Sequence, residues 1–155
     1  MNLKRYYLSA TVLPSVLTVL LLSVNSTNEN LGYESEWFTK EGAIAFDIFF
    51  AILYCLLFFI LDLPILLNKI EPVRKNEIYR LLTWFLLPMG FVISSLIHEI
   101  NFNAKYNEEY TDFTHFLLLN TPFTIGLIWT YLLYTNDKIT SKKSLTSHIS
   151  SLISH

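Results

Sequence analysis

The stretch "LYCLLFFILDLPILLNKIEPVRK", from Leu53 to Lys75, decides the fold. An apolar run contains one aspartate, Asp62, then Pro64, and is followed by a polar, basic segment. In a soluble core an unpaired buried carboxylate would be very costly. In a bilayer a charged side chain costs several kcal/mol at the centre and less near the headgroups. The stretch therefore predicts a membrane helix that reaches an interface close to Asp62.

The composition also indicates that the chain folds in lipid. Hydrophobic residues make up 52% of the 155 residues and charged residues only 15%, whereas soluble domains have about 25% charged residues. The single cysteine, Cys55, excludes an intrachain disulfide and a CxxC redox pair. Crossing about 30 Å of hydrocarbon takes about 20 helical residues. The sequence predicts one all-α transmembrane domain, residues 1–155, with helices at 6–24, 43–67, 81–97 and 113–134 and a tail at 135–155.

The first predicted segment has a second interpretation. Lys4 and Arg5 precede its apolar stretch, which is also the pattern of a cleaved signal peptide. The stretch is close to full spanning length, so we predict a retained first helix.

The distribution of charge predicts the orientation of the helices. Cytoplasmic loops near a membrane carry an excess of Lys and Arg. Nine of the eleven basic residues fall in the N-terminus, in the loop between the second and third segments, or in the tail. The other two loops contain only Lys40 and Lys105, and they carry the acidic residues Glu29, Glu34, Glu36, Glu41, Glu108, Glu109 and Asp112. We therefore predict an up-and-down four-helix bundle with both termini in the cytosol.

Aromatic residues gather near the predicted helix ends. Tyr and Trp are enriched at membrane interfaces, because their rings are apolar and their N–H or O–H groups are polar. The residues that we expect in such a belt are Tyr33, Trp37, Tyr79, Trp84, Tyr106, Tyr110 and Tyr134.

Asp62 has two interpretations. As an interfacial residue it would anchor the helix or pair with Arg80, which opens the third segment. Alternatively, its carboxylate would face a cavity between helices or subunits. Pro64 removes a backbone donor and predicts a kink in the second helix just after Asp62.

Other small or polar residues in the membrane suit contacts between helices. Gly90 and Ser94 form a small-xxx-small pair, which allows close helix approach. The amide of Asn120 must find a partner in the membrane, either inside one subunit or across an oligomer contact. The residues that we expect at inter-helix or oligomer contacts are Asp62, Gly90, Ser94, Asn120 and Thr124.

Two histidines and two carboxylates fall at one predicted depth near the outer face: Asp47, His98, Glu99 and His115. Such a group could bind a transition metal or sense pH, or its histidines could simply hydrogen-bond to neighbours at the interface. The spacing is not local, unlike the HExxH helix of metalloproteases. We predict neither a metal site nor a cofactor.

The cytoplasmic face is the expected partner surface. In the tail, apolar residues recur at helical spacing on one face, and serines cover the rest. So short a tail would be only marginally helical alone in water; it could order on a membrane surface or a partner, or simply fray. The preceding loop, "NKIEPVRKNEIYR", has mixed charges that suit a protein partner. The residues expected to bind that partner are Lys69, Glu71, Arg74, Lys75, Lys142, Lys143, Leu145 and Ile149.

The sequence contains no motif for nucleotide or nucleophilic chemistry. It has no GxSxG, no P-loop and no metalloprotease helix, and its four glycines leave little material for a phosphate cradle. We therefore predict a protein that is not an enzyme. A small drug exporter is disfavoured because the first helix has no acidic residue.

In length, in its four helices and in a cytoplasmic face built from "NKIEPVRKNEIYR" and the tail, the chain resembles the small membrane subunit of the Kiwa antiphage defence system, KwaA. The resemblance implies a homo-oligomer, expected to be a tetramer, in the bacterial inner membrane. It also implies a sensor of phage attachment or injection and a scaffold that recruits a cytosolic, DNA-acting partner, without itself binding nucleic acid. The alternatives are an immunity protein against a membrane-acting toxin and a small ion-conducting pore.

Overall fold

The chain is described by a computed structural model in which almost every described residue is helical and none is in a strand. The described backbone covers residues 3–29, 39–106 and 111–153, with side chains at 3–28, 39–101 and 113–138. In chain order the elements are α1 (Leu3–Glu29), α2 (Lys40–Leu61), the 3-10 helix η1 (Leu63–Lys69), α3 (Glu71–Lys75), α4 (Glu77–Tyr106) and α5 (Thr111–Ile153).

The four predicted spans are confirmed as helices that are long and apolar enough to cross a membrane. They cover residues 3–28, 40–69, 77–101 and 113–138. Each is longer than its apolar run, because helical hydrogen bonding continues through flanking polar residues that hydropathy does not count. The connections from α1 to α2 and from α4 to α5 are therefore shorter than predicted, since α1 continues to Glu29 and α4 to Tyr106.

The second span consists of two pieces, as the position of Pro64 predicts. The N–H of Asp62 donates to the Phe58 carbonyl at 2.9 Å and ends α2. Pro64 has no N–H to continue the ladder. The next bond runs from Ile65 N–H to the Asp62 carbonyl at 3.0 Å, which starts the tighter η1 helix. Asp62 thus lies at the junction between the two helices and is 2% exposed.

Short polar side chains mark the starts of two long helices. The Thr39 hydroxyl accepts a hydrogen bond from Gly42 N–H at 3.2 Å and caps α2. The Asn76 side chain accepts one from Ile78 N–H at 2.9 Å in the first turn of α4. Both satisfy backbone donors that have no partner inside the helix.

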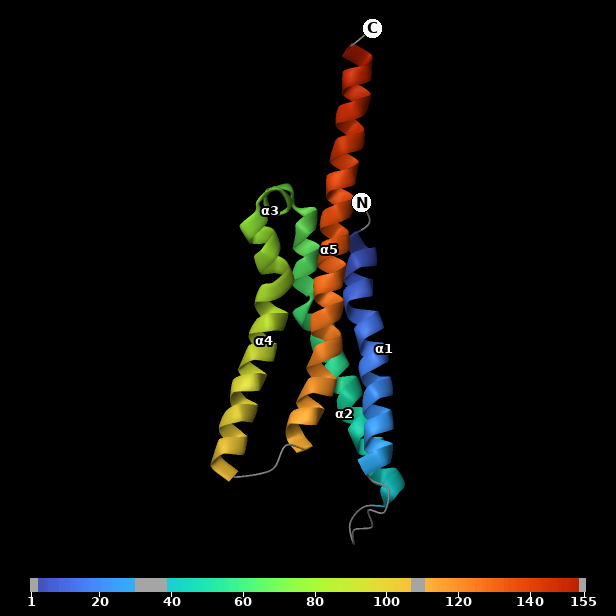
Figure 1. Cartoon of the computed structure of the whole chain (residues 1–155), viewed down its shortest axis with the longest axis vertical. Coiled ribbons are helices and arrows are strands. Elements are labelled where there is room, and N and C mark those ends of the chain that lie inside the picture. Colours follow the sequence, from blue (N-terminus) through green and yellow to red (C-terminus); the bar gives the residue numbers. More distant parts are fainter. Residues whose placement is uncertain (1–2, 30–38, 107–110, 154–155) are drawn as a thin grey trace.

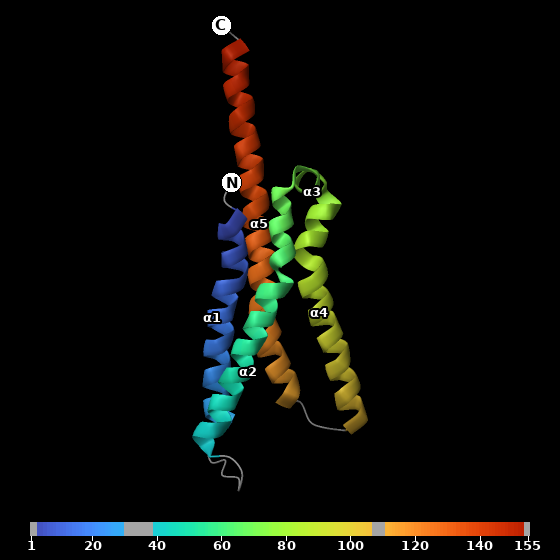
Figure 2. The same cartoon turned by 180° about the vertical axis from the view of Figure 1, so that it is seen from behind.

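The helices pack around α1 and α5. Figures 1 and 2 show α1 running beside α5 and α2, while α4 leans away from the others toward the end opposite α3. The N-terminus, α3 and the projecting C-terminal part of α5 lie at one end, which we call the basic end. At Gly126 of α5, an added Cβ would come within 2.3 Å of Pro14 Cγ in α1. The α1–α5 contact is therefore close enough to require glycine.

Aromatic rings form the core at the basic end. The Trp84 and Tyr134 rings are 5.4 Å apart, and the Tyr6 and Tyr134 rings 5.5 Å apart. Trp84 and Tyr134 are fully buried, so their predicted place in an interfacial belt is wrong. Sequence position gives the depth of a ring but not the side of the helix on which it lies. Of the predicted belt, Tyr79 is exposed as expected, and the side chains of Tyr33, Trp37, Tyr106 and Tyr110 lie outside the described residues.

The outward surface of the spans is apolar. Only 11% to 28% of the residues in each apolar window are buried inside the protein. Soluble monomers rarely expose contiguous apolar patches larger than a few hundred Å². Exposed leucine, isoleucine and phenylalanine side chains along all four spans therefore match a chain whose outer surface contacts lipid.

Candidate functional site

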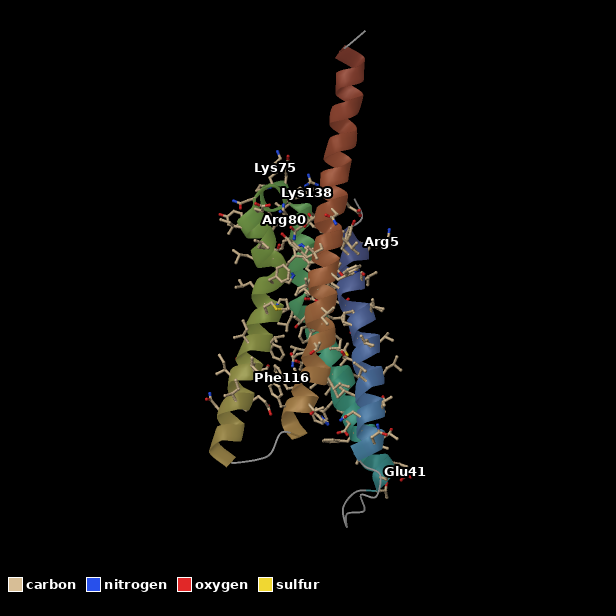
Figure 3. All side chains as sticks on the ribbon, viewed as in Figure 1. Arg5, Glu41, Lys75, Arg80, Phe116 and Lys138 are labelled. Carbon is tan, nitrogen blue, oxygen red and sulfur yellow. The ribbon has the colours of Figure 1, made fainter. Side chains whose placement is uncertain are left out.

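The basic end brings together segments that are far apart in the sequence. Figure 3 labels Arg5, Lys75, Arg80 and Lys138 at this end, and Glu41 at the other. Lys138 Nζ in α5 donates to the Arg74 carbonyl in α3 at 2.7 Å. The Tyr6 hydroxyl of α1 also donates to the Asp137 carboxylate of α5. These bonds join the N-terminal helix, the α3 turn and the exit of α5 into one surface.

The predicted partner-binding residues of the loop all lie on this surface. Lys69, Glu71, Arg74 and Lys75 are exposed. Lys75 Nζ lies 2.6 Å from Glu71 Oε1, and this hydrogen bond and its charge lower the pKa of the Glu71 carboxyl. An exposed pair of this kind contributes little stability. These side chains are therefore available for contact with a partner.

The tail continues α5 beyond its membrane span. Residues 139–153 remain helical and project past the basic end in Figures 1 and 2. The predicted tail residues Lys142, Lys143, Leu145 and Ile149 lie in this extension, and their side chains are outside the described part. The extension starts from a formed helix, so it avoids the cost of nucleation that limits short isolated helices.

Asp62 and Arg80 do not pair with each other in the described residues. Arg80 is buried, and its guanidinium donates to Glu77 at 3.0 Å and to the Tyr131 hydroxyl at 3.4 Å. Among the residues whose side chains are described, Asp62 Oδ1 is buried and has no hydrogen-bond partner. The interfacial ion pair considered for Asp62 is thus not formed, because Arg80 points to α5 instead.

Asn120 supplies an inter-helix hydrogen bond. Its Oδ1 accepts from the Tyr54 hydroxyl of α2 at 2.6 Å, and its Nδ2 donates to the Phe116 carbonyl at 2.9 Å. The side chain is 4% exposed. Both of its polar atoms therefore have partners inside one protomer.

Replacing Asn120 with leucine is expected to destabilise the protomer, because the Tyr54 hydroxyl loses its acceptor in apolar surroundings. Inter-helix hydrogen bonds in a membrane protein average about 0.6 kcal/mol and reach about 1.7 kcal/mol. A double-mutant cycle of Asn120→Leu and Tyr54→Phe, measured by SDS titration, should give a coupling in that range. Zero coupling, with loss of the oligomer for Asn120→Leu in native mass spectrometry, would instead assign Asn120 to a contact between subunits.

The other residues expected at helix contacts lie differently. Gly90 is exposed, and a Cβ added there would meet nothing within 4 Å. Ser94, one turn further along α4, is also exposed and lines a cavity. Within the described part of the chain, the Gly90–Ser94 pair therefore makes no close contact between helices of one protomer. Thr124 is half-buried on α5.

That cavity lies between α4 and α5 toward the end opposite α3, and has a volume of about 600 Å³. Three members of the predicted outer polar group, His98, Glu99 and His115, line it. Asp47 does not, because its carboxylate accepts a hydrogen bond from the Ser26 hydroxyl at 2.6 Å. Among the described residues, no group of His, Cys, Asp and Glu has the geometry of a metal site.

Sequence reasoning missed two residues that organise these sites. Tyr54 was hidden in an apolar run, although a tyrosine in mid-membrane needs a partner for its hydroxyl. Asn68 is buried at the end of the same run and donates to the Thr83 hydroxyl at 2.7 Å, which ties η1 to α4. In both cases the sequence shows a polar residue inside an apolar segment, and this pattern could have indicated a buried hydrogen bond.

By length and composition, the four apolar helices class the chain as a multi-pass α-helical membrane protein. Comparison with known proteins adds no family, since no family model, curated protein or solved structure matches the sequence.

Proposed function

We propose that this chain is a non-enzymatic membrane scaffold that holds a cytosolic protein partner at its basic end. The observation that carries the proposal is the hydrogen bond from Lys138, the residue just before the α5 extension, to the Arg74 carbonyl of α3. Exposed charges of both signs on α3 favour a protein partner over a purely anionic surface. The apolar positions of the serine-rich extension suit a partner that covers one face of the helix.

The proposed topology is an up-and-down bundle with both termini in the cytosol. Its support is the grouping of basic residues with the two termini, since Lys and Arg are enriched in cytoplasmic loops. Reporter fusions at both ends should report the cytosol. Two ends on opposite sides of the membrane would contradict this topology.

The proposed biological setting is antiphage defence in a bacterial inner membrane. It rests on the resemblance to the Kiwa membrane subunit in length, helix number and cytoplasmic face. In this setting the chain forms a homo-oligomer, senses phage attachment or injection as a membrane disturbance, and recruits a partner that acts on phage DNA. The exposed charged residues of α3, at the basic end of the membrane-spanning helices, support the recruiting role.

Site-specific photocrosslinking in cells tests the recruiting surface. A crosslinkable residue replaces Glu71 on α3 or, as the matched control, Glu41 at the other end. We expect one cytosolic protein to be captured from position 71 and not from position 41. Capture from position 41 alone, or capture of a secreted or membrane-acting toxin, would refute the scaffold proposal and favour an immunity protein.

A further inference from the structure

The cavity between α4 and α5 is lined by several polar residues although it lies within the membrane-spanning helices. Seven of its nine lining residues carry a polar side-chain group. They come from three helices: Tyr54 from α2, the Ser94–Glu99 turn from α4, and His115 and Asn120 from α5. Tyr54 and Asn120 bond to each other, whereas Ser94, Ser95 and Glu99 have no hydrogen-bond partner within the described residues. Because uncompensated polar groups in lipid are costly, these three side chains favour a ligand with polar groups.

Glu99 indicates the charge of that ligand. It is half-buried, lines the cavity, and lies two residues before the end of the third span at Asn101. Within the described residues it forms no ion pair, since the salt bridges found there join Lys75 to Glu71 and Arg80 to Glu77. Carboxylates within spans are usually paired. A cationic group from outside the described chain would supply the missing partner.

Helix α4, which lines one side of the cavity, has exposed positions next to it. Figures 1 and 2 show α4 separating from α5 toward this end. The face that carries Ser94 continues toward mid-membrane at Gly90, where a Cβ added to the glycine would have no atom within 4 Å. Ile93 and Ile97 are exposed on α4 beside it. An apolar chain attached to a polar head therefore has space along α4.

We propose that the cavity binds the headgroup of a phospholipid with a primary ammonium, of the phosphatidylethanolamine class. Its ammonium pairs with the Glu99 carboxylate, and its phosphate accepts hydrogen bonds from the Ser94 and Ser95 hydroxyls. The acyl chains run along α4 past Gly90.

This site is separate from the partner surface, because the two lie at opposite ends of the helices. Loss of partner recruitment and loss of lipid binding can therefore be told apart.

Lipid competition in native mass spectrometry tests the proposal. The full chain in detergent is offered phosphatidylethanolamine, phosphatidylcholine and phosphatidylglycerol with identical acyl chains. The ethanolamine lipid should bind about tenfold more tightly than the other two, as expected for one charge-assisted hydrogen bond. Glu99→Gln should abolish this preference. The matched control Glu41→Gln removes an acid at the same end of the molecule, outside the cavity, and should retain it.

Three results would overturn the assignment. The first is equal binding of the three lipids by the unaltered chain, or an unchanged preference in Glu99→Gln. The second is binding of free phosphoethanolamine as tightly as the lipid, which would indicate a soluble ligand. The third is efficient disulfide crosslinking between copies through Ser94→Cys in a Cys55→Ser background, which would show that a second copy occupies the cavity.

Discussion

Replacing Gly126 with alanine is expected to lower the free energy of unfolding far more than the same change at Gly90. The added Cβ would come within 2.3 Å of Pro14 Cγ, and Pro14 belongs to a rigid ring inside α1. The ring cannot rotate aside, so α1 and α5 must separate. Overpacking of this kind costs roughly 1–3 kcal/mol. SDS titration of the protein in bicelles measures the loss.

Gly90→Ala is the matched control for this prediction. It adds the same methyl group to α4, where nothing lies within 4 Å, and alanine keeps the position small. Its unfolding free energy should stay close to that of the unaltered protein. Equal losses in the two variants would show that helix flexibility, rather than the α1–α5 contact, determines the effect.

Reversing two charges on α3, with Arg74→Glu and Lys75→Glu, is expected to abolish recruitment of the proposed partner. Both side chains are exposed at the basic end and support no buried structure. Deletion of the chain after Asp137 should have the same effect, because it removes the α5 extension from the same surface. Co-purification of the partner from cells gives the readout.

Membrane insertion must remain intact for this result to be interpreted. Loops with excess Lys and Arg set topology, so reporter fusions should confirm that both variants keep the orientation of the unaltered protein. Lys40→Glu, at the other end of the molecule, is the matched charge reversal and should leave recruitment unchanged. If the partner co-purifies normally with both the α3 variant and the truncated chain, the proposed partner-binding surface is refuted.

The sequence by itself determined the spans and the break in the second one. Whether a segment enters lipid depends on the summed transfer free energy of about 20 consecutive residues. That sum can be calculated from the sequence alone. Pro64 likewise ends the α-helical hydrogen-bond pattern because proline has no backbone N–H. This effect does not depend on the neighbouring segments. The position of Asp62 beside this break followed from the same local chemistry.

Only the tertiary structure decided which side of each helix faces its neighbours. It placed Trp84 and Tyr134 in the core rather than at an interface, and directed Arg80 to Tyr131 instead of Asp62. It also separated α4 from α5 and formed a cavity lined by residues of three helices. Helix rotation and partner choice in lipid depend on many small packing and hydrogen-bond terms between segments far apart in sequence. Mean hydropathy does not contain those terms. It could therefore predict the depth of each residue in the membrane, but not which side chains contact one another.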